Sequence, residues 1–145
     1  MFELMTKGVR TVKPTMPAEE AWALMRRAGI HHLVVVRESQ IVGILSDRDI
    51  GGRAGAAVRT GRTVADLMTT AVVTRAPTDT VRSAANVMRG RSIGCLPIVE
   101  GGRPVGMVTV SDLLNVLARG GDRRVSGERA VLNWKVPHRR RRSAW

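Results

Sequence analysis

Two copies of one pattern organise this chain of 145 residues: Ile41-Val42-Gly43-Ile44-Leu45-Ser46-Asp47-Arg48-Asp49-Ile50 and, 63 positions later, Pro104-Val105-Gly106-Met107-Val108-Thr109-Val110-Ser111-Asp112-Leu113. Each copy has a glycine, two apolar residues, a small hydroxyl residue and, three positions beyond it, an aspartate predicted to open an apolar helix. A hydroxyl and a carboxylate then meet at a strand-to-helix corner, where the free N–H groups of the helix also point. Such a corner can hold a phosphorylated sugar.

The repeat extends well beyond these ten residues. Residues 4–50 align with residues 67–113 without a gap and give 16 identities in 47 pairs. Two units that share one supersecondary pattern usually pack together, because neither buries its apolar face alone. We therefore interpret residues 1–120 as one domain made of two halves.

The first half predicts the order strand, helix, strand, strand, helix. Between Ala18 and Ala28 an apolar residue recurs every three or four positions, and Gly29 suits the end of that helix. The apolar runs at 33–36 and 41–45 predict strands joined by a turn, and a shorter strand is expected at 9–12. Asp49 would open the last helix, which the glycines at 51, 52 and 55 end.

The second half is expected to follow the same course. Its first helix carries Val81, Ala84 and Met88 on one face, a turn at 100–103 joins its two main strands, and Ser111 is a candidate cap of the last helix. The linker between the halves is flexible by composition and free to order around a ligand.

Composition excludes several classes of protein. No apolar run approaches the roughly 20 residues needed to span a bilayer, and the N-terminus lacks a signal-peptide pattern, so we expect a cytoplasmic protein without membrane contact. Cys95 is the only cysteine and is expected in the core, and the three histidines have no metal-ligand spacing. We find no catalytic constellation and therefore expect no enzyme.

The gapless duplication, with both terminal motifs intact, resembles a pair of CBS domains, also called a Bateman module. The resemblance implies an α/β (α+β) fold in which two motifs pack about a pseudo-twofold axis. It places the first motif at 1–58, the second at 59–121 and a basic, flexible tail at 122–145. It also implies a stand-alone regulatory module with no required cofactor, and a homodimer.

In that family the clefts between the motifs bind adenosine-containing ligands, namely AMP, ADP, ATP or S-adenosylmethionine. The resemblance implies that Asp49 and Asp112 hydrogen-bond the ribose hydroxyls of the ligand. It also implies that Ser46 and Thr109 supply a hydroxyl group near the phosphate or the ribose. Other candidate ligand-binding residues are His31, His32 and Arg48 for phosphate, Ser111 as the counterpart of Arg48, and Met5, Arg10, Met68 and Val73 around adenine. The counterparts of the two histidines are Gly94 and Cys95, so the two sites are chemically unequal.

Structural alternatives remain for these residues. The two motif aspartates also suit the first turn of a helix, and Ser46 and Thr109 suit caps. His31 and His32 also suit the segment that follows the end of a helix, with their rings partly exposed. Gly43 and Gly106 are expected to allow a close backbone approach or a bend.

The basic C-terminus allows other functions. From Arg119 onward nine Lys and Arg face only Asp122 and Glu128, within a net charge of +12 for the whole chain. The tail is therefore either solvated, or a contact for nucleic acid or another polyanion, or a segment that docks on a second subunit. The alternatives to a ligand sensor are a nucleic-acid-associated protein and a dimerisation adaptor with empty clefts.

Overall fold

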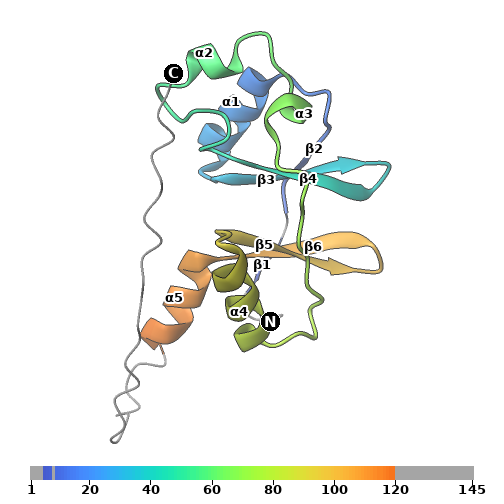
Figure 1. The fold of residues 1–145 in the computed structure, drawn as a ribbon, viewed down its shortest axis with the longest axis vertical. Helices are drawn as coiled ribbons and strands as arrows, with labels where there is room; N and C mark the ends of the chain where they lie inside the picture. The colour runs from blue at the N-terminus through green and yellow to red at the C-terminus, as the bar shows by residue number, and fades with distance from the viewer. Residues whose placement is uncertain (1–4, 8, 120–145) are drawn as a thin grey trace, which may run out of the picture.

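Two three-stranded sheets face each other at the centre of the molecule, and the helices cover their outer faces (Figure 1). This computed structural model describes residues 5–7 and 9–119. The elements are β1 (Thr6–Lys7), β2 (Thr11–Val12), α1 (Ala18–Ala28), β3 (His32–Arg37), β4 (Gln40–Ser46), α2 (Ala56–Arg59), α3 (Val64–Leu67), α4 (Val81–Arg91), β5 (Cys95–Glu100), β6 (Arg103–Thr109) and α5 (Val110–Arg119). The mixed α/β fold class predicted from the sequence is confirmed.

The two hairpins are built alike. In β3–β4 the residues at the turn, Glu38 and Ser39, have φ of 50° and 67°, and in β5–β6 Gly101 and Gly102 have φ of 57° and 78°. Two consecutive positive φ angles make the tight turn whose twist matches that of the strands. Each hairpin also has one register shift at the same repeat position, after Val35 and after Ile98. Both predicted turns are therefore confirmed.

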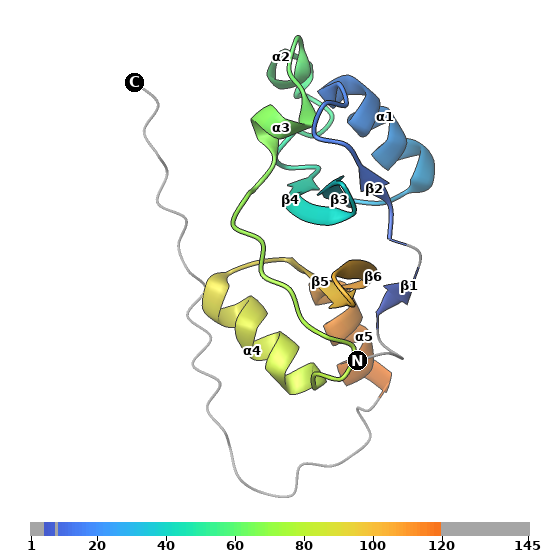
Figure 2. The same cartoon turned by 90° about the vertical axis from the view of Figure 1, so that its right-hand side faces the viewer.

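The first segment of each half pairs with the hairpin of the other half. β1 runs antiparallel to β6 with Thr6 opposite Met107, and Thr69 forms an antiparallel bridge to Ile44 in β4. Figure 2 shows β1 beside the second hairpin, away from β2, which adds to β3. The sequence predicted one strand at 9–12, whereas the structure has two short strands because the chain crosses between the sheets there.

The motif glycines make this crossing possible. A Cβ on Gly43 would lie closer than 3.0 Å to Met68 Cγ, and one on Gly106 closer than 3.0 Å to Met5 Cγ. Real Cβ atoms do not approach other atoms so closely, so the expected close approach at Gly43 and Gly106 is confirmed. Each methionine comes from the half opposite to the glycine that it covers.

Three apolar clusters hold the fold together. One lies between α1 and the first sheet around Met25 and Leu33, and a second lies between α4 and the second sheet around Met88 and Leu96. The third, with Val34, joins both hairpins at the centre and includes the buried Cys95, as the sequence predicted. Its members from both halves fix how the two sheets face each other.

The last helix predicted for the first half is absent. Residues 47–51 form turns instead, because Gly51 and Gly52 adopt φ of 81° and 59° and the Gly52 N–H donates to the Asp47 carbonyl at 2.8 Å. The chain then forms only the short helices α2 and α3. In the second half the corresponding helix, α5, is formed as predicted, while the first strand of that half is reduced to bridges such as that of Arg75 with Ile98.

Candidate functional site

An open cleft of about 850 Å³ lies where the two halves meet. Both repeated corners contribute to its wall, together with the crossing segments 9–10 and 71–73. Of the twelve predicted ligand-binding residues, nine line the cleft: Arg10, His31, His32, Ser46, Arg48, Asp49, Val73, Thr109 and Ser111. The fold therefore brings together side chains from residue 10 to residue 111.

The first corner is held by reciprocal hydrogen bonds. The Ser46 N–H donates to Asp49 Oδ2 at 2.8 Å, and the Asp49 N–H donates to Ser46 Oγ at 3.2 Å. This is the arrangement of a capping box, although no regular helix follows here. Among the described residues, the carboxylate of Asp49 accepts the hydrogen bond from the Ser46 N–H through Oδ2, so its other oxygen is available to a ligand in the cleft.

The second corner repeats this arrangement and corrects one assignment. The Thr109 N–H donates to Asp112 Oδ2 at 2.7 Å, and the Asp112 N–H donates to Thr109 Oγ1 at 3.3 Å. Thr109, and not Ser111, is therefore the capping residue, since α5 already begins at Val110. Ser111 is exposed and lies on the cleft wall, in the first turn of α5.

The two histidines differ in their surroundings. His31 is 75% exposed, and its Nδ1 lies 3.0 Å from Asp47 Oδ2. His32 is half-buried at the start of β3, directly opposite Ser46. Burial lowers the pKa of the His32 imidazole below its ordinary value, while the nearby Asp47 carboxylate acts in the opposite direction. His32 is therefore predominantly neutral at pH 7 in the absence of a ligand.

Cys95 occupies the place of His32 in the second half, opposite Thr109. Burial raises the pKa of its thiol to about 11, and the Asp49 carboxylate of the other half contributes to this rise. Asp49 and Cys95 both line the cleft, one from each half. The two corners thus share one space but present different groups to it.

Three predicted residues lie outside the cleft wall. Met5 is buried beneath Gly106, and Met68 packs against the first core cluster beneath Gly43. Asp112 is turned toward the Thr109 backbone within α5. These positions favour a packing role for the two methionines and a positioning role for Asp112.

One charged residue of the cleft was missed by the sequence reasoning. Asp47 lines the wall and faces His31, whereas its counterpart in the second half is the apolar Val110. The sequence did contain a signal for Asp47, because it places a carboxylate directly after the motif serine. It was overlooked because the resemblance gave ligand roles at this corner only to Ser46, Arg48 and Asp49.

Protonation of His32 is expected to destabilise the ligand-free protein at low pH. Because its pKa is lowered on folding, the unfolded chain binds the proton more readily, and stability is lost as pH falls below about 6.5. Thermal unfolding at pH 7.5 and 5.5 should show a smaller decrease in Tm for His32→Gln than for the unmodified protein. An equal decrease in both proteins would contradict this assignment.

Comparison with known proteins identifies the family. The family model for the CBS domain matches residues 2–50 and 64–119, so the chain belongs to the CBS domain family. The two matched segments correspond to the two halves seen in the fold. The predicted membership is therefore confirmed.

Several relatives share this unit. The CBS domain-containing protein YhcV of Bacillus subtilis is 36% identical over 112 residues, which are 77% of this chain and 80% of YhcV. An inosine-5′-monophosphate dehydrogenase of Thermoplasma acidophilum is 30% identical over 112 residues, but the match spans only 22% of that enzyme. The CBS domain pair of MJ0100, solved in complex with 5′-methylthioadenosine and S-adenosyl-L-methionine, has a TM-score of 0.74 at 27% identity and covers 82% of this chain and 95% of its own.

Other predictions are tested less directly. Within the described part of the chain, no helix is long and apolar enough to cross a membrane, and no cluster of three or more potential ligand side chains could hold a metal ion. The basic tail at 122–145 lies outside the described residues, so its possible contact with nucleic acid remains a prediction.

Proposed function

We propose that this chain is a regulatory module that binds an adenosine-containing ligand, such as AMP, ADP, ATP or S-adenosylmethionine, in the cleft between its two motifs. The observation that carries the proposal is the cleft itself, which joins the Ser46–Asp49 corner to apolar walls from both halves. Its volume of about 850 Å³ is suitable for a ligand of nucleotide size. The MJ0100 pair, of the same fold, binds two adenosyl compounds.

The wall offers a partner for each part of such a ligand. The free oxygen of Asp49 can accept hydrogen bonds from a ribose diol, and these charge-assisted bonds are among the stronger ones. Arg48 and His32 are near enough to the same corner to meet a phosphate. The apolar residues Val9, Val72 and Ile93 line the wall and suit an adenine ring.

The crossing of the two halves supplies a route for regulation. The segments 9–10 and 71–73 line the cleft and continue directly from Thr6 and Thr69, which pair with the opposite hairpins. A ligand that contacts both segments would favour one arrangement of the halves over another. The signal is then a shift in this arrangement, which a partner protein can detect.

Calorimetric titration of AMP, ATP and S-adenosylmethionine tests the proposal. Asp49→Ala is expected to weaken binding of the preferred ligand at least about tenfold, because a charge-assisted hydrogen bond is lost. Asp112→Ala is the matched control, since it removes the same capping interaction but lies outside the cleft wall. The absence of binding to the intact protein, or equal losses in both variants, would refute the proposal.

The predicted homodimer remains a prediction. Helix α5 presents Leu114 and Leu117 to solvent, with exposures of 59% and 69%. A second copy of the chain would cover such an apolar face.

A further inference from the structure

We propose that the first corner of the cleft continues into a second groove that holds the terminal phosphates of a nucleoside di- or triphosphate, with Arg26 and Arg53 as the phosphate-binding residues. The inference rests on the proposed function, because it concerns the same ligand. It adds a preference among the possible ligands and assigns a role to two residues that lie outside the two glycine–hydroxyl–aspartate motifs.

The two cavities adjoin each other. The second groove, of about 370 Å³, shares Ile30, His31 and Asp47 with the wall of the cleft. From there it runs along the end of α1, past Trp22, to the turn that carries Arg53. A ligand whose ribose lies at Asp49 can therefore extend past the His31–Asp47 pair without leaving a continuous surface.

The charges of the groove favour an anion. Arg26 and Arg53 are exposed on its wall, and neither forms an ion pair with any described residue. Among the described residues, the only carboxylate on the groove wall is that of Asp47, which already faces His31. A guanidinium group can donate two parallel hydrogen bonds to a phosphate, so two of them would hold a terminal phosphate firmly.

Two of the carbonyl groups in the last turn of α1 are paired, which reduces the negative potential that this helix end directs at the groove. The Gly29 N–H donates to the Arg26 carbonyl at 3.3 Å, and the Ile30 N–H donates to the Met25 carbonyl at 3.0 Å. Gly29 has a φ of 64°, which turns the chain away and closes this cap. At this helix end the charged side chain on the groove wall is that of Arg26.

Among the described residues, the second half does not repeat the charges of Asp47 and Arg53. Val110 stands in the place of Asp47, and α5 occupies the position of the turn that carries Arg53. The first corner is therefore the one at which we expect the additional phosphates of a ligand. This asymmetry arises from the missing helix of the first half.

Titration with AMP, ADP and ATP at one ionic strength tests the inference. The unmodified protein should bind ATP at least about tenfold more tightly than AMP, and Arg53→Gln should reduce the ATP affinity about tenfold while changing the AMP affinity less than about twofold. Arg26→Gln should act in the same direction. Arg27→Gln is the matched control, because Arg27 is exposed on the same turn of α1 but lines neither cavity.

The possible outcomes separate this inference from the proposed function. If AMP binds and ATP binds no more tightly, or if Arg53→Gln weakens both equally, the groove does not hold the terminal phosphates although the cleft still binds a nucleotide. If none of the three nucleotides binds, both the inference and the choice of these ligands are refuted. A selective loss of ATP affinity in both groove variants, absent in Arg27→Gln, supports the inference.

Discussion

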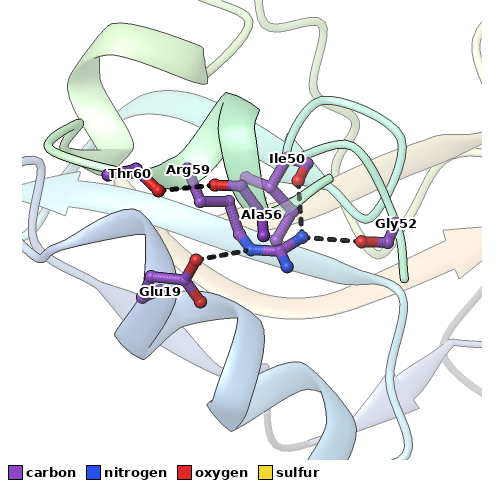
Figure 3. A network of polar contacts seen from close by, with 6 residues as sticks. All are labelled: Glu19, Ile50, Gly52, Ala56, Arg59 and Thr60. Atoms are coloured by element: carbon purple, nitrogen blue, oxygen red, sulfur yellow. Dashed lines mark hydrogen bonds and ion pairs between the residues drawn. The ribbon is translucent and has the colours of Figure 1, made fainter. Parts of the chain in front are cut away.

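Replacement of Arg59 by methionine is expected to lower the free energy of unfolding by about 3 kcal/mol. Arg59 is only 4% exposed, and its Nη1 donates to the carbonyls of Ile50 and Gly52 at 2.9 and 2.6 Å (Figure 3). The guanidinium carbon also lies 4.7 Å from the centre of the Trp22 ring. Methionine would fill much of the space but leave both carbonyls without this donor. Urea unfolding followed by circular dichroism measures the loss.

The ion pair of Arg59 provides the matched control. Its Nε lies 3.2 Å from Glu19 Oε1, but the side chain of Glu19 is 52% exposed, and the Nε–H is not aligned for a hydrogen bond. Glu19→Gln should therefore cost less than about 1 kcal/mol, as is usual for exposed pairs. The loss in free energy of unfolding for Arg59→Lys should lie between those of Arg59→Met and Glu19→Gln. A loss in Arg59→Met no larger than in Glu19→Gln would show that the two carbonyl contacts do not hold the linker.

The repeat predicted much of the fold because it encodes local preferences that tertiary packing does not override. The helix that ends at Gly29 and the turn at Gly101 and Gly102 follow from the backbone freedom of glycine, and both were predicted correctly. The equal spacing of Gly43 and Gly106 from their motif hydroxyls likewise predicted two equivalent corners. These features depend on residues close together in the chain.

The crossing of the halves could not be predicted in the same way. β1 and β2 have two residues each, which is too short for an alternating pattern to appear. The side chain of Met5 is buried only because its segment pairs with a strand about 100 positions away. Its assignment to the ligand site therefore followed the alignment of the repeats and could not take account of the packing.

The linker was misread for a related reason. Its composition suggested a flexible segment that is free to order around a ligand, whereas Arg59 is buried and holds the segment through hydrogen bonds to backbone carbonyls. A single buried cation leaves no periodic signal in the sequence. The candidate site was affected as well, because Arg53 enters the second groove only through the fold of this linker.

Substitution of Gly55 by alanine is expected to lower the free energy of unfolding by about 3 kcal/mol, in the upper range for overpacking of a buried site. Gly55 precedes α2 with φ of −95° and ψ of 20°, angles that alanine also adopts, so backbone strain is not the cause. The added Cβ would instead lie closer than 3.0 Å to backbone atoms of Gly51. A backbone cannot rotate away as a side chain can, so the turn at 51–55 must open.

Gly52→Ala separates this steric effect from the effect of backbone conformation. Gly52 has a φ of 59°, which disfavours alanine, but no atom lies within 4 Å of the position of its Cβ. Its substitution should therefore cost only about 1 kcal/mol. Because the turn at 51–55 carries Arg53 and supplies the Gly52 carbonyl to Arg59, Gly55→Ala should also weaken ATP binding more than Gly52→Ala does. Equal stability of the two variants in urea would show that the turn tolerates opening and that the close contact between Gly51 and Gly55 does not hold the linker in place.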